Sequence, residues 1–565
     1  MAALFTTPKR NDTTAGTHVA EPDVRRRIGL AHGSWRRVTR RIVAGAVCAL
    51  TVSSLLMPSV SLAAEWVKVG GNKYNTAASD EAGTWSWDGA DDLKLNNYNG
   101  GEIQAAGKLN VNYSGNNIVT ADWIEGIKAS HGTNENAELN IQGDAGSTLS
   151  VTSTEDAILS TGNINIDGAG SVNATSTGFD AINAGGDLAI KGSGNVNATG
   201  ASDGIRANGN ITIDDSGAVT ARATEDKGIG TDKDLTIKGG GTVEASSEKD
   251  AAVEAKGSLA ATNASLNANG VEYGVYVHKG ITLDHANVTV RASKGRYGSA
   301  IALFTYQDDI VVKNGSTVDA FAEGEVSAAF STRNDPPNEE GGHIYISDSV
   351  VKAIARYVEN GDGPIPYSEN QDGETSPEPQ GENFGIIAQT SEGVTPAVIS
   401  IIRSKVTAEG DTAAIFARAV SADGTAIGTI KIENAAIQTP EGGKVIDYRK
   451  LRDGIYEAGQ AIGTGDATVD SLYIKAVAKS TTIAPPEVAK PEDPKPDETK
   501  PAESKQDPKP EGAKTTKTVA VATTKAKATG VLAATGDTSG AAIVAAALAG
   551  TAAIAAGTMA SRKRS

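Results

Sequence analysis

The sequence has little cysteine and few aromatic residues. It contains one cysteine in 565 residues, and aromatic side chains make up 4% of the chain, whereas glycine contributes 64 residues. The one cysteine, Cys48, lies in an N-terminal apolar run that we expect to be removed. The mature chain would then have neither a disulfide nor a thiol for catalysis. Scarce aromatics and abundant glycine disfavour a large helical core and favour many turns with small, closely stacked side chains.

Positive charge is concentrated at the two ends of the chain. The formal net charge is −17, and residues 1–63 carry +6 while residues 536–565 carry +2, so the body between them carries −25. Such a body should repel nucleic acid and anionic lipid. We therefore expect no nucleic-acid partner.

The N-terminal 63 residues have the layout of a secretory signal peptide. A basic stretch ends at Arg41 and precedes the apolar run IVAGAVCALTVSSLLM, which is followed by Pro58 and SVSLAAE. Ser61 and Ala63 are small, which favours cleavage between Ala63 and Ala64. The basic region is long, and both an extended signal and a start site placed too far upstream remain open.

The body repeats with a period of about 24 residues. From residue 156 the sequence reads DAILSTGNINIDGAGSVNATSTGF, DAINAGGDLAIKGSGNVNATGAS, DGIRANGNITIDDSGAVTARATED and KGIGTDKDLTIKGGGTVEASSEK. Each unit holds three short pieces of β type, recognised by a marker residue, an alternating apolar pair and a single valine. The markers are Ile158, Ile182, Ile205, Ile229 and Val253; the pairs begin Ile164/Ile166, Leu188/Ile190, Ile211/Ile213 and Leu235/Ile237; the valines are Val172, Val196, Val219 and Val243.

This pattern predicts an all-β fold, a right-handed parallel β-helix. Alternation with period two puts the apolar residues on one face of each strand, and the Gly, Asn and Asp clusters between strands are typical of turns. Three short strands in about 24 residues are too few for a propeller blade and fit one coil of a solenoid. Roughly a dozen coils would give a rod of about 50–60 Å. An irregular β-sandwich is the alternative.

The repeat continues with looser spacing to about residue 483. We expect the markers to continue as Val275, Ile301, Phe330, Ile386 and Ile415, interrupted by a loop over residues 357–381. Upstream, Leu139/Ile141 and Leu109/Val111 fit weaker coils, but residues 64–125 differ in containing four of the five tryptophans, Trp66, Trp85, Trp87 and Trp123. A solenoid needs a cap over its first coil. We therefore predict a cap at 64–125 and coils at 126–483.

Aspartates recur at nearly the same phase of several coils. They are Asp156, Asp180, Asp203 and Asp250, with Lys227 interrupting. The favoured interpretation is that each accepts backbone N–H bonds in its turn. The alternative is coordination of calcium, the only cofactor that the pattern suggests. The GGxGxD repeat of calcium-binding β-helices is absent.

Enzyme activity is the less favoured interpretation. Many β-helical proteins are polysaccharide lyases or hydrolases, and such lyases resemble one another in grouping carboxylates with a basic residue on one outer face. The candidates for such a group here are Asp180, Asp203, Arg206, Arg222 and Lys227. The histidines of the mature chain show no metal-ligand spacing; they are His131, His278, His285 and His343. We expect no catalytic residues.

The segment Trp85-Ser86-Trp87 places two indoles on one face of a strand. Exposed, the pair would be a platform for stacking sugar rings, and buried, it would be the core of the cap. The cap core is favoured, because the rest of the chain supplies few large apolar groups.

The C-terminal part of the chain divides into a linker and a three-part tail. Residues 484–531 are rich in Pro, Lys and Glu and cannot bury a core, so we expect an extended spacer. The tail, residues 532–565, joins the pentapeptide Leu532-Ala533-Ala534-Thr535-Gly536 to the apolar span 541–560 and the basic stub Arg562-Lys563-Arg564. A span of about 20 apolar residues can cross a bilayer as a hydrophobic helix.

This tail resembles the cell-wall sorting signal of Gram-positive surface proteins. The commonest form has Pro at the second position, where this chain has Ala533, as in the LAxTG form of high-GC Gram-positive bacteria. The resemblance implies that a sortase cleaves between Thr535 and Gly536 and joins the Thr535 carboxyl to peptidoglycan after a transient membrane insertion. A permanent membrane anchor is the alternative.

Together these features predict a surface-display protein. We expect secretion, covalent attachment to the cell wall, and binding of an extracellular glycan or another surface ligand by the β-helix. The repeats also resemble bacterial surface domains described as carbohydrate-binding. A wall-tethered polysaccharide lyase or hydrolase is the alternative function.

Overall fold

The structure is a computed structural model that describes residues 63–131, 137–293, 298–337, 340–358, 382–452, 455–465 and 476–486. The chain separates into two units, Met1–Val488 and Ala489–Ser565, and all described residues belong to the first. These residues form 45 strands in three sheets, and among them there is no helix of the length and apolarity needed to cross a membrane. The linker beyond residue 486, the sorting signal 532–565 with its span 541–560, and most of the 357–381 loop lie outside the described residues.

The strands of the three sheets follow in their spatial order. The 16-stranded sheet contains β2 (Asn72–Tyr74), β1 (Val67–Val69), β7 (Ile103–Ala106), β10 (Ile127–Ser130), β13 (Ile158–Ser160), β16 (Ile182–Ala184), β19 (Ile205–Ala207), β22 (Ile229–Thr231), β25 (Val253–Ala255), β28 (Tyr273–Val277), β31 (Ser299–Thr305), β34 (Val326–Asn334), β37 (Asn383–Thr390), β40 (Ala413–Ser421), β44 (Ile455–Gly463) and β43 (Lys444–Arg452). The 15-stranded sheet contains β3 (Ala78–Ser79), β4 (Trp85–Trp87), β5 (Asp92–Asn96), β8 (Leu109–Ser114), β11 (Leu139–Gly143), β14 (Ile164–Gly168), β17 (Leu188–Lys191), β20 (Ile211–Asp214), β23 (Leu235–Lys238), β26 (Leu259–Thr262), β29 (Ile281–Asp284), β32 (Ile310–Lys313), β35 (Ile344–Ser347), β38 (Val398–Ile402) and β41 (Thr429–Glu433). The 14-stranded sheet contains β42 (Ala436–Thr439), β45 (Ser480–Ala484), β39 (Lys405–Gly410), β36 (Val350–Tyr357), β33 (Thr317–Gly324), β30 (Asn287–Ser293), β27 (Ser265–Gly270), β24 (Thr242–Ser247), β21 (Val219–Ala223), β18 (Val196–Gly200), β15 (Ser171–Ser176), β12 (Thr148–Ser153), β9 (Asn116–Ala121) and β6 (Asn99–Gly100).

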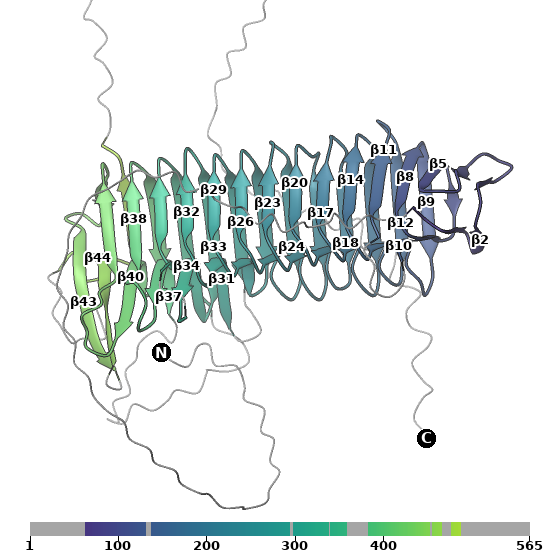
Figure 1. Cartoon of the computed structure of the whole chain (residues 1–565). Helices are drawn as coiled ribbons and strands as arrows, with labels where there is room; N and C mark the ends of the chain where they lie inside the picture. Colours follow the sequence, from purple (N-terminus) through teal and green to yellow (C-terminus); the bar gives the residue numbers. More distant parts are fainter. Residues whose placement is uncertain are drawn as a thin grey trace, which may run out of the picture. The chain divides into compact units, whose positions relative to one another are not determined.

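Each coil contributes one strand to each sheet, so the predicted parallel β-helix is confirmed. In one coil β14, β15 and β16 follow one another, and each pairs in parallel with the strand three places later in the chain. Figure 1 shows these strands side by side along the stack. Twelve parallel strands, from β7 to β40, succeed one another in the 16-stranded sheet. At about 4.8 Å per strand they span about 53 Å.

The core is a continuous apolar column inside the coils. The markers Ile158 and Ile182 pair directly, as do Ile164 with Leu188 and Val172 with Val196. Inward residues such as Ile211 are fully buried. The alternation seen in the sequence is thus the alternation between this core and the outer surface.

The corner between the 15-stranded and 14-stranded sheets turns on one residue with a left-handed backbone. It stands four residues after the first inward residue of the preceding strand, as Gly168, Gly192 and Gly239 do with φ of 103°, 79° and 83°. Non-glycine residues with positive φ occupy the same phase in other coils: Asn97, Asp215, Asn263, His285, Asn314, Asp348, Arg403 and Asn434. Gly, Asn and Asp predominate because they tolerate this conformation at low cost.

Antiparallel strands close both ends of the described stack, and the N-terminal cap is shorter than predicted. The pairs β1–β2, β3–β4 and β4–β5 are antiparallel, but β5–β8 and β7–β10 are already parallel. Residues 92–125, which the sequence analysis assigned to the cap, therefore form the first coils. At the other end β44 pairs antiparallel with β40, and β45 with β39. The sequence analysis did not anticipate this second closure.

One predicted marker is wrong. Val275 pairs with Leu303, and Leu303 pairs with Phe330, so Leu303 is the inward residue of its coil. Ile301 belongs instead to a second apolar cluster outside the main core. The reason is that β31 is buried over nearly all its length, so its sequence shows no alternation.

Candidate binding surface

The loops that lead from the 14-stranded to the 16-stranded sheet, here called the acidic corner, carry three of the predicted aspartates. Asp156, Asp180 and Asp203 each stand two residues before a marker isoleucine. The Oδ1 atom of each accepts a hydrogen bond from a backbone N–H of the next coil. These donors are Asp180, Asp203 and Lys227, at N–O distances of 3.0, 2.9 and 2.8 Å. The carboxylates thus satisfy backbone groups in the turns.

The second carboxylate oxygens also have partners. The Asn183 amide donates to Oδ2 of Asp156 at 3.2 Å and to Oδ2 of Asp180 at 2.9 Å. A guanidinium nitrogen of Arg206 lies 3.4 Å from Oδ2 of Asp203. Calcium takes six to eight oxygen ligands. In the described parts of the chain no three His, Cys, Asp or Glu side chains form a group that could hold a metal ion, so these aspartates do not fit a calcium site.

Asp250 does not belong to the column. Val253 pairs with the marker Ile229, so the residue in phase with Asp203 and Lys227 is Ala251. The Asp250 carboxylate accepts the N–H of Ala251 at 2.7 Å and lies 3.4 Å from the Lys227 ammonium. The sequence could have shown this, because Asp156 stands two residues before its marker Ile158 whereas Asp250 stands three residues before Val253.

Burial gives the acidic corner unusual proton affinity. Removal from water raises the pKa of Asp156 and of Asp203 to about 6 and raises the pKa of Asp180 above its ordinary value. Neighbouring carboxylates in the column add to the effect, and the backbone hydrogen bonds oppose it. The column carries less negative charge near pH 6 than the sequence suggests.

The structure brings four of the five suggested catalytic residues together at the acidic corner, namely Asp180, Asp203, Arg206 and Lys227. Arg206 lies on β19 and pairs with Asp203 and with Asp232, the latter at 3.8 Å. Arg222 lies on β21 in the 14-stranded sheet. Lys227 contacts Asp226 and lies 3.6 Å from Glu254. The basic groups of the corner are thus held in ion pairs within the coil stack.

The four histidines have separate partners. His131 is 3.5 Å from Glu65, and His285 is 2.7 Å from Asp284. The His278 ring lies 4.9 Å from the Tyr276 ring at an interplanar angle of 48°, and burial lowers the pKa of His278. The Nδ1 atom of His343 accepts the N–H of Val398 at 3.1 Å.

A second apolar cluster lies on the outer side of the 16-stranded sheet from β28 onward. Its aromatic members stack between neighbouring coils, with ring centroids 5.4 Å apart for Tyr276 and Phe304 and 5.5 Å for Phe384 and Phe416. The three phenylalanines are nearly fully buried. The sequence analysis did not single them out, although unbroken apolar runs such as IALF could have indicated strands buried on both faces.

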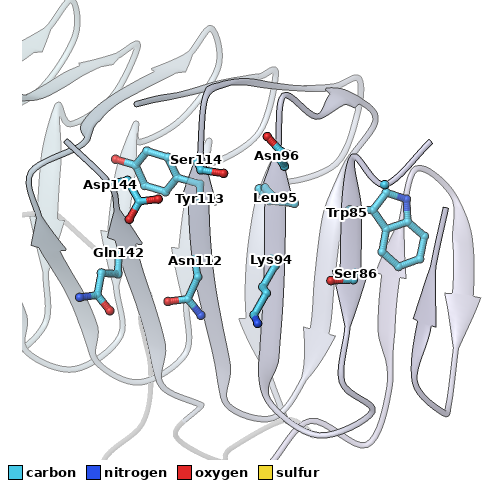
Figure 2. A pocket seen from close by; sticks show the side chains of 11 residues that line it. Trp85, Ser86, Lys94, Leu95, Asn96, Asn112, Tyr113, Ser114, Gln142 and Asp144 are labelled. Atoms are coloured by element: carbon cyan, nitrogen blue, oxygen red, sulfur yellow. The ribbon is translucent and has the colours of Figure 1, made fainter. Parts of the chain in front are cut away.

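Trp85 and Trp87 belong to the cap core and offer no exposed platform. They are 7% and 2% exposed, Tyr74 packs on Trp85 at 5.1 Å, and the Trp87 indole donates to the Ala90 carbonyl at 3.2 Å. An open depression of about 470 Å³ lies beside Trp85 on β5, β8 and β11. Figure 2 shows Lys94, Asn112 and Gln142 side by side along its floor.

Two aromatic side chains on the acidic corner are exposed. Trp123, in the segment predicted to be the cap, is 86% exposed in the loop between β9 and β10. Phe179, in the loop between β15 and β16, is 51% exposed. Both precede marker positions, Trp123 by four residues and Phe179 by three. The sequence signal was an aromatic residue in a turn phase where the repeat coils have small, polar or charged residues, such as Thr154, Ala201 and Asp226.

The other predicted site residues lie at or beyond the ends of the described stack. Ala63 bridges to Lys108, and Ala64 is buried in the core. Leu532, Ala533, Ala534, Thr535 and Gly536 lie outside the described residues.

Comparison of the chain with family models, with curated proteins and with solved structures finds no match.

Proposed function

We propose that this chain is a cell-wall-anchored surface protein whose β-helix binds an extracellular glycan. The observation that carries the proposal is the order of segments. A signal-like head precedes a β-helix, a Pro-rich linker and a tail with the pentapeptide, apolar span and basic stub of a sorting signal. This order suits a domain displayed at a distance from the cell.

The β-helix supports a binding role because it presents long, regular outer faces. Repeat proteins of this kind commonly bind extended ligands along such faces. The acidic body disfavours polyanionic ligands, and the polar outer residues in the open depression beside Trp85 offer amide and ammonium donors. A neutral polysaccharide is the ligand class that these features favour.

Anchoring is tested by fractionating cells that produce the protein. Muralytic enzymes should release it, whereas detergent should not, because a covalent bond through Thr535 would hold it to peptidoglycan. Substitution Thr535→Lys should leave secretion intact and shift the protein to the membrane or the medium. Complete extraction of the unaltered protein by detergent would overturn wall anchoring.

Binding is tested with the purified full chain on a panel of neutral and acidic polysaccharides. We expect retention of a neutral polysaccharide without any new reducing ends or unsaturated sugars in the supernatant. Product formation would instead establish the alternative, a wall-tethered lyase or hydrolase. The absence of any glycan binding would remove the glycan-binding part of the proposal and leave anchoring intact.

A further inference from the structure

Trp123 and Phe179 lie on one corner of the β-helix, two coils apart. Trp123 precedes β10 and Phe179 precedes β16, and β10, β13 and β16 are consecutive parallel strands. Two strand spacings separate the residues by about 10 Å along the coil axis. This separation is comparable to the length of two linked sugar rings.

The backbone holds both aromatic residues in fixed positions. Trp123 has φ of 62°, and among the described non-glycine residues with positive φ it alone lies away from the left-handed corner. Its N–H donates to Oγ1 of Thr154 in the next coil at 2.7 Å. The N–H of Phe179 donates to Oγ of Ser176 at 2.9 Å. A bulky residue in this conformation is strained, and such strain persists mainly where function requires it.

The surroundings of the two residues combine apolar and acidic groups. Leu159 lies between Lys128 and Asn183 in the outer column of the 16-stranded sheet and is partly exposed. Glu155 belongs to the coil between those of Trp123 and Phe179. Asp156 and Asp180 are members of the aspartate column at the same acidic corner. An aromatic surface beside carboxylates accepts the C–H face of a neutral sugar and its hydroxyl donors, and it repels uronic acids and sulfated sugars.

From this arrangement we infer that Trp123 and Phe179 form a two-ring platform that binds a neutral polysaccharide running along the coil axis. The inference rests on the proposed glycan-binding function and assigns it a site on the acidic corner. Because hydrogen bonds hold the backbone at both positions before the ligand arrives, little loop freedom is lost on binding.

Quantitative binding of a neutral polysaccharide that the full chain retains will test the platform. Trp123→Ala and Phe179→Ala should each weaken binding at least tenfold, with the folded state checked by circular dichroism. Tyr345→Ala is the matched control, because Tyr345 is an aromatic residue 36% exposed on β35 of another sheet. Its affinity should match that of the unaltered chain.

Tryptophan fluorescence gives a second readout, since Trp123 is 86% exposed whereas Trp66 is partly exposed and Trp85 and Trp87 are buried. Saturating neutral oligosaccharide should protect the chain from acrylamide quenching, and Trp123→Phe should abolish this protection. Binding should change little with salt, as expected for an uncharged ligand.

Each contrary result has a distinct meaning. Glycan binding that both alanine variants retain overturns the platform and leaves the glycan-binding function standing. Failure of every neutral glycan to bind overturns both. Self-association of the full chain that Trp123→Ala abolishes would show that a second copy, and not a glycan, covers the two rings.

Discussion

Asp203 shows why a buried carboxylate in this fold need not belong to an active site. Its Oδ1 atom accepts the Lys227 N–H, and at a second corner Asn163, Asp187 and Asn210 do the same for the coil that follows each of them, at 2.7–3.3 Å. Asn and Asp alternate there, so an acceptor is required and a charge is not. The sequence predicted this turn role for four aspartates, and Asp156, Asp180 and Asp203 have it, whereas Asp250 accepts the N–H of its neighbour Ala251.

The stability of the Asp203→Asn variant relative to the unaltered chain should therefore increase as pH rises. The folded-state pKa of Asp203 is about 6 against an ordinary value of 3.8, so the folded chain binds more protons than the unfolded chain between about pH 4 and 6. The stability that Asp203 contributes is present below this window and is lost as pH rises through it. Chemical denaturation of both chains from pH 4 to 7 should show the difference in unfolding free energy shifting toward the asparagine variant.

Asp203→Ala is the matched control for this prediction. It leaves the Lys227 N–H without its acceptor and should destabilise the fold by about 1–3 kcal/mol across the range. A fall in the relative stability of the asparagine variant with rising pH would contradict the pKa argument.

The left-handed corner gives a second residue-scale prediction. Gly192 has φ of 79°, and a Cβ added there would lie 2.3 Å from the Gly168 carbonyl oxygen of the preceding coil. Gly192→Val should cost more than the ~1–2 kcal/mol of left-handed strain alone, because neither backbone can retreat. Asn263→Gly, at the same phase, should change stability by less than about 1 kcal/mol. Equal losses of thermal stability in the two variants would contradict this account.

At the scale of the strand, the sequence identified the inward residues correctly where one face of the strand is exposed to solvent. The strands from β13 to β25 have three to six residues, and every marker from Ile158 to Val253 pairs as predicted. In the 16-stranded sheet β31, β34, β37 and β40 are buried on both faces, so periodicity could not distinguish Ile301 from Leu303 as the inward residue of β31. The exposed aromatics of the acidic corner were missed because each occurs in a single coil, so no repeat marks it.

Ile211→Asp in β20 should be severely destabilising. Ile211 is fully buried between Leu188 and Leu235 of the neighbouring coils, so a carboxylate there would have no partner. We expect a loss of several kcal/mol, visible as insoluble protein or a large drop in the urea midpoint. Thr212→Asp is the control, because Thr212 faces outward on the same strand. A comparable loss of stability in Thr212→Asp would contradict this account, because it would mean that β20 tolerates a charge on neither face.

At the scale of the whole molecule, stability is transmitted from coil to coil, so the ends matter more than their size suggests. Each coil buries its inward residues against its neighbours alone, and the last coil needs a partner that is not another coil. The antiparallel strands at the C-terminal end supply that partner. Ile483 of β45 is fully buried and pairs with Val406 of β39. This closure has no repeat signature, which is why the sequence did not reveal it.

Ending the chain at residue 435 should therefore expose the last parallel strands and cause self-association. Without β42–β45 the edges of β39 and β40 are unpaired, and such edges pair with other chains. We expect a concentration-dependent increase in size by light scattering and a lower unfolding temperature. A chain ending at Val488, the boundary of the first compact unit, keeps the closure and should remain as stable as the full chain. If the two shortened chains behave alike, the antiparallel strands are dispensable and the parallel coils hold together without them.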